Sequence, residues 1–342
     1  MKCAEVALLA NTPSEAKGGC AFIVASNVLG GHEYQSAALA SHYAKIAPVT
    51  IFLNQEVLAP AFSRIPNATV IVNPGAYISR GTLPRQVLKG AVGKRHLVRQ
   101  LSGFGEIVVC AGAIEAAIPS AIALRGHPCL NLYLPFLYDR RVLWGAWGCV
   151  YNLLAFPWIN LFRSIITINR IQATLMRRWV WGDTKVRVHR NSVLPLDRLP
   201  VTDVAPRLVC IGRLDRQKRV PELIRAVDSP AHGFKELLII GDGPKRDEVR
   251  RAASAARFIK VDLLGWVPTE QQSRRLNGQD ILVLNSAIEG EPLVLREARE
   301  RGMRVLAADI PGVRGVTKPS ERYGSKAALL GKLAGLRCSS YS

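Results

Sequence analysis

Short apolar runs rich in Val, Ile and Leu recur along the chain and alternate with longer segments in which apolar residues repeat with a helical period. Strands buried on both faces show such continuous apolar runs, so the alternation predicts an α/β fold with parallel sheets. In the first half, residues 36–45 and 119–126 are predicted helices, and the predicted strands are residues 21–26, 49–53, 69–72, 106–111, 129–134 and 164–168.

The same alternation starts again after residue 206, with predicted strands at residues 207–212, 236–241, 260–265, 280–285 and 304–309. Residues 191–206 hold three prolines and no helical period, a composition that suits a connection between domains. A chain of 342 residues is also longer than one core usually serves. We therefore expect an N-terminal extension (1–19), a first domain (20–198), a linker (199–206) and a second domain (207–342).

The composition is that of a globular protein, with 49% hydrophobic and 21% charged residues. The formal charge of +20 favours polyanionic partners, which include nucleic acid, anionic lipid and phosphorylated substrates, and the sign alone does not choose among them. The seven cysteines lie far apart and form no CxxC pair, so we expect reduced, mostly buried thiols in a cytoplasmic protein. Glu5 interrupts the only early apolar stretch, which excludes the pattern of a signal peptide.

Residues 142–162 contain no charged side chain and are flanked by Arg140, Arg141 and Arg163. The length is just sufficient to span a bilayer, but the segment includes Pro157, two glycines and two asparagines. Three interpretations stay open: a membrane span, a helical region that touches the membrane surface, and ordinary core. The aromatic and basic flanks favour surface contact.

Ligands of parallel sheets bind beyond the carboxyl ends of the strands, so the loops after the predicted strands are candidate sites. The loop after residues 207–212 carries Arg213, Lys218 and two more arginines before a helix predicted to start near Pro221. A helix N-terminus with added cations is suited to a diphosphate. The alternative is a solvated basic loop.

Two more loops carry glycines at strand ends. Gly241 and Gly243 would permit a nucleotide base or ribose to approach the backbone closely, and a tight strand-to-helix turn is the alternative. Gly265 ends another predicted strand, where its backbone could hydrogen-bond a base edge. The alternative there is a strand terminus followed by a core tryptophan, Trp266.

The loop and helix at residues 285–302 hold two carboxylates, Glu289 and Glu297. The pattern predicts a helix from about Leu293, which places Glu289 in the loop and Glu297 about one turn into the helix. One could then hold the transferred group and the other a ribose diol. Alternatively, Glu297 pairs with Arg301 and Glu289 caps the helix.

In the first half, Gly30 and Gly31 separate a predicted strand from a helix expected to begin near Glu33. This arrangement allows a phosphate to approach, but it lacks the third glycine of a dinucleotide fingerprint. A lone Gly-Gly turn is usually structural. The histidines, including His32, are expected to be surface or packing residues.

Together these loops resemble the retaining glycosyltransferase family 4, whose GT-B fold has two Rossmann-like domains facing across a cleft. Four features occur in the order of that family: Gly-Gly-x-Glu at 30–33, Gly-Arg-Leu…Lys at 212–218, Gly-Asp-Gly-Pro at 241–244 and Glu-x7-Glu at 289–297. Each motif is weak alone, and the combination is specific. The resemblance covers roughly residues 20–315 and is strongest after residue 205.

The resemblance implies that Arg213 and Lys218 bind the donor diphosphate and stabilise the leaving nucleoside diphosphate. Glu289 would contact the hydroxyls of the donor sugar, and Glu297 the ribose. Fixed cations at a helix terminus would neutralise the leaving group, so no metal or cofactor is expected besides the nucleotide diphosphate sugar. The other expected donor contacts are at Gly31, Gly243, Gly265, Gly290, Pro292 and Leu293.

The predicted function is transfer of a sugar from a nucleotide diphosphate sugar to a carbohydrate or lipid-linked acceptor, with retention, in cell-surface polysaccharide or lipopolysaccharide synthesis. The protein would be cytoplasmic, with membrane contact through residues 142–162. One alternative is a GT-B-type nucleotide-sugar epimerase, which needs no acceptor. Another is a non-enzymatic basic protein that binds nucleic acid or membranes. Basic residues are scattered and no aromatic RNA platform is present, so a nucleic-acid partner is not expected.

The sequence departs from the family in two places. Many relatives carry a histidine at the end of the strand that corresponds to residues 129–134, where this chain has Tyr133, Leu134 and Pro135. Relatives also continue further after the last predicted elements, so the second domain is expected to be shortened.

Overall fold

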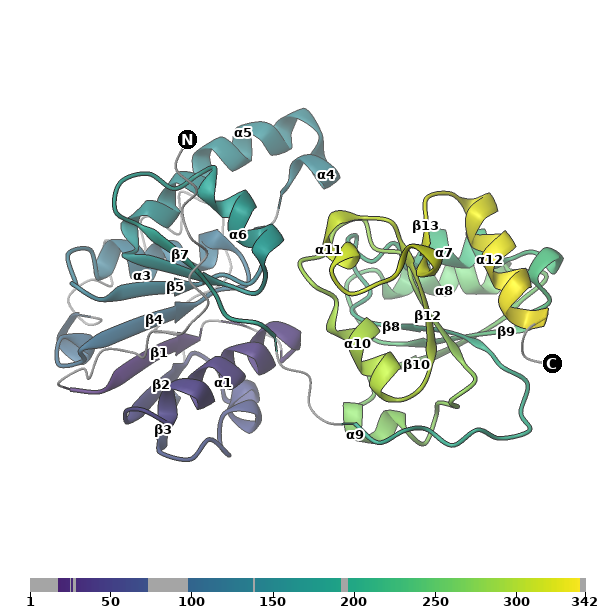
Figure 1. Cartoon of the computed structure of the whole chain (residues 1–342), viewed down its shortest axis with the longest axis horizontal. Helices are drawn as coiled ribbons and strands as arrows, with labels where there is room; N and C mark the ends of the chain where they lie inside the picture. Colours follow the sequence, from purple (N-terminus) through teal and green to yellow (C-terminus); the bar gives the residue numbers. More distant parts are fainter. Residues whose placement is uncertain are drawn as a thin grey trace. The chain divides into compact units, whose positions relative to one another are not determined.

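The computed structural model of the protein describes residues 18–24, 26, 29–72, 98–137, 139–191 and 196–338. Most of the predicted extension, residues 1–17, lies outside this description. The chain divides into two compact units, unit 1 (residues 1–192) and unit 2 (residues 193–342). Each unit contains one parallel sheet with helices packed on both faces (Figure 1).

The described part of unit 1 contains a seven-stranded sheet with the order β3-β2-β1-β4-β5-β6-β7. Its strands are β1 Cys20–Val24, β2 Val49–Leu53, β3 Ala68–Val72, β4 Glu106–Cys110, β5 Leu130–Tyr133, β6 Ser164–Thr167 and β7 Lys185–Val188. Its helices are α1 Gly31–Ala44, η1 Glu56–Ala61, α3 Ile114–Ala123, α4 Arg141–Trp144, α5 Ala146–Ala155, η2 Phe156–Leu161 and α6 Arg170–Arg177.

Unit 2 contains, among its described residues, a six-stranded parallel sheet with the order β10-β9-β8-β11-β12-β13. Its strands are β8 Leu208–Ile211, β9 Glu236–Ile240, β10 Lys260–Gly265, β11 Ile281–Leu284, β12 Arg304–Ala308 and β13 Arg322–Tyr323. Its helices are α7 Val220–Val227, η3 Pro230–His232, α8 Arg246–Ala255, α9 Thr269–Gln272, α10 Leu293–Glu300, α11 Pro311–Arg314, η4 Pro319–Glu321 and α12 Lys326–Cys338.

The central strands are buried on both faces, which explains why they appear in the sequence as continuous apolar runs. In β1, Ala21 and Ile23 pack into one hydrophobic cluster. Cys20, Phe22 and Val24 pack into the cluster on the other face of the sheet. In β8, Leu208 and Val209 likewise belong to different clusters. Each sheet is therefore the middle layer of a three-layer unit.

The α/β class with two parallel sheets is confirmed, and all eleven predicted strands are present with small shifts at their ends. Two strands were missed. β7 is largely solvent-accessible and carries Lys185 and Arg187, so it lacks an apolar run. β13 has only two residues, too few for a pattern.

The chain just before unit 2's first strand packs on unit 2. The Leu199 N–H donates to the Arg301 carbonyl at 3.0 Å, and the Gly278 N–H donates to the Pro200 carbonyl at 3.0 Å. Leu199 is buried in one of the hydrophobic clusters of that unit. Part of the segment expected to be a linker therefore has fixed contacts.

Both sheets have the same topological feature. The strand order reverses between β1 and β4 in unit 1 and between β8 and β11 in unit 2. Loops that leave two such neighbouring strands diverge over opposite faces of the sheet and leave space at its carboxyl edge for a ligand. In unit 2, the loops at this position are those that carry Arg213, Lys218 and Glu289.

The charge-free segment 142–162 is divided into α4, α5 and η2. Gly145, with φ +57°, breaks the chain direction between α4 and α5. No helix in the described ranges combines the length and the apolar character needed to cross a bilayer. The segment is partly core, because Phe156 and Ile159 are buried, while the outer side of α5 is exposed.

Candidate functional site

The loops that follow β8 and β11 meet at the carboxyl edge of the sheet in unit 2, because these strands pair directly. The Ala287 N–H donates to the Gln217 carbonyl at 2.8 Å, and the Gln217 side chain donates to the Ile288 carbonyl at 2.8 Å. The Arg219 guanidinium donates to the carbonyls of Asn285 and Ser286. These contacts join two segments about 70 residues apart in sequence.

Lys218 and Glu289 form an ion pair where the two loops meet, with 2.6 Å between Nζ and Oε1. Only 18% of the lysine side chain and 8% of the glutamate side chain are exposed. The Ser286 hydroxyl donates to the same Oε1 at 2.6 Å, and Gln217 Nε2 lies 3.4 Å from Oε2. The carboxylate is therefore neutralised and held by hydrogen bonds.

The charge on Lys218 depends on this contact. Burial by itself acts to lower the pKa of the ammonium, because it removes water from the charged form. The charge and hydrogen bond of Glu289, with a smaller effect of Asp215, outweigh burial and raise the pKa of Lys218 above its ordinary value of 10.5. Lys218 is thus a fixed cation at neutral pH.

Arg213 is the more accessible cation of the loop. Its side chain is 48% exposed, and its Nε lies 3.9 Å from the Asp215 carboxylate, at the limit of an ion pair. The other oxygen of Asp215 accepts hydrogen bonds from the Gln217 and Lys218 N–H groups, which holds the loop in its turn. Arg213 can therefore interact with an added anion without breaking a close contact.

Helix α10 begins at Leu293, as predicted. Its N-cap is Pro292, with no side-chain cap, so the alternative in which Glu289 caps the helix is wrong. The Arg301 guanidinium donates to Gln272 Oε1 at 3.1 Å, and its positive charge also acts on the Glu297 carboxylate.

The Glu297 carboxylate is partly buried, and no side chain of the described residues hydrogen-bonds to it. Burial raises its pKa above the ordinary value of 4.5, and the charge of Arg301 offsets this only in part. A poorly solvated carboxylate with unused acceptor capacity is costly for folding. Such a cost is common at sites that act on a ligand.

The glycines after β9 have a structural explanation. A Cβ at Gly241 would lie 1.9 Å from the Gly212 carbonyl oxygen, and a Cβ at Gly243 would lie 2.5 Å from the Leu214 carbonyl oxygen. The close approach that these glycines permit is therefore to the backbone of the loop that carries Arg213. This agrees with the tight-turn alternative.

The loop after β10 is more open. Gly265 has φ +71°, its carbonyl accepts from the Gly241 N–H at 2.7 Å, and nothing lies within 4 Å of a Cβ placed on it. Trp266 is 64% exposed, so the interpretation of this residue as a core tryptophan is wrong. Its indole ring is accessible to a planar partner.

The structure adds residues that the sequence did not reveal. A Cβ at Gly312 would lie 1.9 Å from the Glu289 carbonyl oxygen, so α11 packs directly on the backbone of the glutamate loop. Ser286 and Gln217 hold the Glu289 carboxylate. Gly290 and Pro292 are buried, and Leu293 is half-buried. Serine and glutamine in loops carry no sequence signal that separates this role from simple solvation.

In unit 1, α1 begins at Gly31, two residues before the predicted start, and Gly30 is its extended N-cap. The His32 ring stacks on the Tyr133 ring at the end of β5, with centroids 5.9 Å apart and planes 13° apart. Burial lowers the pKa of His32, so the ring is neutral at pH 7. The ring contact shows a packing role for His32, as expected.

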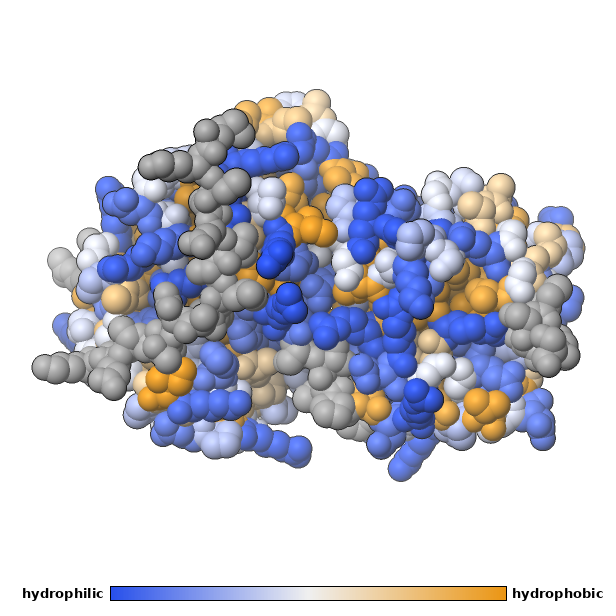
Figure 2. Space-filling view, in the orientation of Figure 1, coloured by the Kyte–Doolittle hydropathy of each residue, from blue (hydrophilic) through white to orange (hydrophobic). Residues whose placement is uncertain are grey.

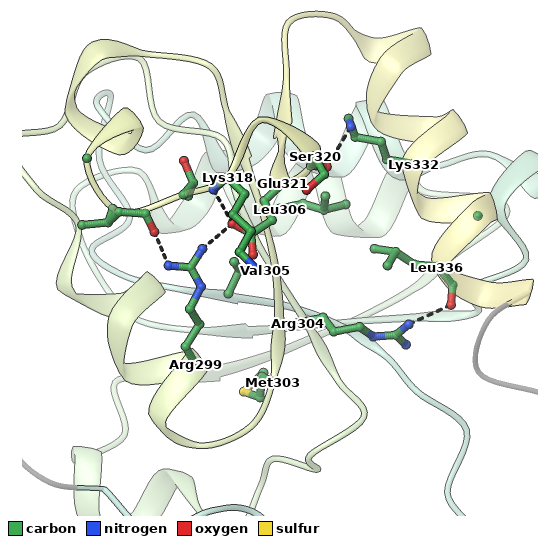
Figure 3. A pocket seen from close by; sticks show the side chains of 14 residues that line it. Arg299, Met303, Arg304, Val305, Leu306, Lys318, Ser320, Glu321, Lys332 and Leu336 are labelled. Carbon is green, nitrogen blue, oxygen red and sulfur yellow. Dashed lines mark hydrogen bonds and ion pairs between the residues drawn. The ribbon is translucent and has the colours of Figure 1, made fainter.

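A cavity of about 810 Å³ lies elsewhere in unit 2, beside β12 and α12 (Figure 3). Its lining includes none of the predicted donor-site residues. Three of its cations are bound within the protein: Arg299 to Glu321, Arg304 to the Leu336 carbonyl at 3.0 Å, and Lys332 to the Ser320 carbonyl at 2.7 Å. This cavity lies along the first half of β12 and is separate from the loops of the predicted site.

Residues 199–327 match the protein family described as "Glycosyl transferases group 1". The chain is 32% identical over 132 residues to TuaC of Bacillus subtilis (strain 168), a glycosyltransferase assigned to teichuronic acid biosynthesis. It is 30% identical over 128 residues to lipopolysaccharide 1,6-galactosyltransferase of Escherichia coli (strain K12). The matches cover 38% and 35% of this chain, but only 30% and 34% of the relatives.

Solved structures resemble the protein over most of its length. HepE of Anabaena in complex with UDP and glucose has a TM-score of 0.70 and 16% identity, over 96% of this chain and 90% of that one. The lipopolysaccharide outer core galactosyltransferase WaaB in its apo form has a TM-score of 0.64 and 18% identity, over 94% and 91%. Identities this low show the shared fold alone.

Residues 199–327, within unit 2, therefore resemble the group 1 glycosyltransferases, and the two-sheet fold of the chain matches that of GT-B glycosyltransferase structures. All residues of the β8 and β11 loops described above lie within the matched segment.

The packing of the β9 loop leads to a stability prediction. Gly243→Ala places a methyl group against the backbone of Leu214, and we expect it to lower the free energy of unfolding by about 1–3 kcal/mol. Gly331→Ala is the control, because this glycine is exposed on α12 and has nothing within 4 Å of a Cβ. The control should raise stability by about 0.5–1 kcal/mol in denaturant unfolding. If both substitutions changed the free energy of unfolding equally, the proposed packing of Gly243 on Leu214 would be wrong.

The ion pair can be tested by removing one or both partners. Lys218→Met leaves the Glu289 carboxylate buried without a cation. It should lower the free energy of unfolding by about 3–5 kcal/mol. The double variant Lys218→Met, Glu289→Gln should cost much less, since neither partner is left charged.

The pH dependence follows from the raised pKa of Lys218. The stabilisation is complete below the ordinary value of 10.5 and is lost as the pH rises through the folded-state pKa. The stability of the double variant should not fall in this way at alkaline pH. A single variant as stable as the wild type would show that the pair is unimportant.

Glu297→Gln should increase the free energy of unfolding at pH 7 by roughly 0.5–2 kcal/mol, because it removes a poorly solvated charge. The raised pKa means that the wild type is stabilised as the pH falls through the folded-state pKa of this carboxyl group, and the variant should lack that change. Glu300→Gln, an exposed position on the same helix, serves as the control. A loss of stability in Glu297→Gln alone would refute the argument.

Proposed function

We propose that the protein transfers a sugar from a nucleotide diphosphate sugar to a carbohydrate or lipid-linked acceptor, with retention of configuration at the sugar. The observation that carries this proposal is the Lys218–Glu289 pair at the topological switch point of unit 2, beside the accessible Arg213. It lies within the segment that matches the group 1 glycosyltransferases. A switch point with fixed cations is suited to a ligand that carries a diphosphate.

In the proposed complex, Arg213 binds the diphosphate directly, because its guanidinium is exposed and only weakly paired. Lys218 adds a second positive charge, held in place by Glu289. As the bond to the sugar breaks, negative charge grows on the departing nucleoside diphosphate. Cations that are already fixed stabilise this charge without reorganisation, which is the largest contribution expected from such a site.

The carboxylates would position the rest of the donor. Glu289 is oriented by Lys218 and Ser286, and in the proposal it accepts from hydroxyls of the transferred sugar. Glu297 has unused acceptor capacity, which suits the two hydroxyls of a ribose. The backbone at Gly243 and Gly265 would lie near the base, with the remaining donor contacts at Gly31, Gly290, Pro292 and Leu293.

The named relatives support a role in cell-surface polysaccharide or lipopolysaccharide synthesis. One is assigned to teichuronic acid biosynthesis and the other is a lipopolysaccharide galactosyltransferase. The HepE structure contains UDP and glucose, so UDP-sugars are the first donors to test. A lipid-linked acceptor would place the reaction at the inner face of the cytoplasmic membrane, and no nucleic-acid partner is proposed.

The donor site is tested by measuring the binding of UDP, GDP and ADP to single variants. Arg213→Ala should weaken the preferred nucleoside diphosphate at least tenfold, since a hydrogen bond to a charged group contributes about 1.5–3 kcal/mol. Arg257→Ala is the control, because this exposed arginine precedes β10 at the opposite edge of the sheet. It removes the same charge and should change affinity less than twofold.

Transfer is then measured with the corresponding sugar donors. The protein should release the nucleoside diphosphate from one of them, and Arg213→Ala should slow this release. If no donor binds, or if both arginine variants behave alike, the proposed donor site is wrong. Interconversion of donor sugars without any transfer would instead indicate an epimerase.

A further inference from the structure

Helix α5 presents a face that is unusual for a surface exposed to water. Its sequence contains no charged residue, and four of its large apolar side chains are strongly exposed. Trp147 is 79% exposed, Leu153 62%, Leu154 58% and Val150 49%. At 100° per residue these four side chains fall within one continuous arc of the helix. Figure 2 shows apolar side chains at the top of the view, where Figure 1 places α5.

The opposite side of α5 is anchored in unit 1, so the direction of the exposed face is fixed. Gly148 packs on the backbone of Arg140, where a Cβ would lie 2.4 Å from the carbonyl oxygen. Asn152 accepts from the Arg140 N–H at 3.3 Å and donates to Asp139 at 2.8 Å. The Arg140 guanidinium is buried, pairs with Glu115, and lies 4.4 Å from the centre of the ring of Tyr151.

Helix α4 extends the apolar face. Val142 is 51% exposed and Trp144 is 47% exposed, and the turn at Gly145 holds α4 beside α5. The Arg140 guanidinium also lies 5.8 Å from the centre of the Trp144 ring. The six exposed large apolar side chains described in α4 and α5 are hereafter the apolar face. They are Val142, Trp144, Trp147, Val150, Leu153 and Leu154.

The sequence that contains the apolar face is strongly basic. Residues 139–190 contain nine Lys and Arg residues but only two Asp residues. Among the arginines, Arg163, Arg170 and Arg178 are exposed. The turn after α6 is joined to η2 through Asn160, which donates to the Trp179 carbonyl at 2.8 Å and accepts from the Trp181 N–H at 2.9 Å. This turn brings Arg178 and the exposed Trp181 next to the end of the charge-free segment 142–162.

We propose that the apolar face docks on an anionic lipid bilayer, with the surrounding arginines against the headgroups. Exposed Leu and Val side chains insert into the boundary of the acyl chains, and tryptophans favour the interface. Arginines near the surface add attraction to anionic lipids. A bilayer needs no complementary shape, and its anionic headgroups match the basic sequence on both sides of the apolar face. The inference is independent of the proposed donor chemistry.

Vesicle flotation with the full-length protein tests the proposal. The protein should float with vesicles of phosphatidylcholine mixed with phosphatidylglycerol, and much less with pure phosphatidylcholine. The variant Trp147→Ser, Leu153→Ser, Leu154→Ser should partition at least tenfold more weakly. The matched control is Val57→Ser, Val201→Ser, Phe258→Ser, which removes three exposed apolar side chains at other places and should bind as the wild type does.

Two further measurements separate the outcomes. The denaturant unfolding transition of the triple variant should be as cooperative as that of the wild type, which shows that the variant is folded without relying on the proposed donor site. Brominated lipids should quench the wild-type tryptophan fluorescence more than that of Trp147→Phe.

Equal binding of the wild type and the triple variant would overturn the proposal, as would no binding at all. Binding that does not depend on phosphatidylglycerol would refute the anionic component. A concentration-dependent dimer that the triple variant abolishes would assign the face to a second copy of the chain instead.

Discussion

The ion pair between Lys218 and Glu289 is the contact on which the arrangement of the proposed donor site depends. It joins the loop after β8 to the loop after β11 where the strand order reverses. Its two charges are buried together, so neither is stable without the other. Hydrogen bonds of the Gln217 carbonyl and side chain to the loop after β11, and the packing of Gly312, support the same junction. The position of the more exposed Arg213 follows from this junction, because it belongs to the loop that the pair holds.

The pair also changes the interpretation of its two members. From sequence, Lys218 and Glu289 are separate ligands, one for the diphosphate and one for the sugar. In the structure each is the nearest partner of the other, so Lys218 acts in part by orienting Glu289. In the proposed complex, the direct contact with the diphosphate falls first to Arg213. Glu297 differs from both, since no side chain of the described residues lies within ion-pair distance of its carboxylate and its pKa is raised by burial.

Unit 1 uses a buried charge for a different purpose. Arg140 has no access to a ligand and instead holds α4 and α5 together, through Glu115 and the rings of Tyr151 and Trp144. The result is a rigid support for a helix whose outer side chains are apolar. Arg140 is buried and Trp147 is exposed, which is the reverse of the usual distribution of polar and apolar side chains. Such a reversal is common where a surface meets a partner.

The α/β class, eleven of the thirteen described strands and the start of α10 could be predicted from the sequence, because buried parallel strands are continuous apolar runs and helices have their own period. The partly exposed β7 and the two-residue β13 lack such a run. Arg213, Lys218, Glu289 and Glu297 could be found as charged residues in loops after strands. How these loops meet is visible only in the folded chain. The Gly243 packing, the role of Ser286 and the exposure of Trp266 depend on neighbours far away in the chain, and local patterns carry no information about them. The orientation of segment 142–162 was decided in the same way, since an apolar run shows that side chains avoid water but not which face remains exposed.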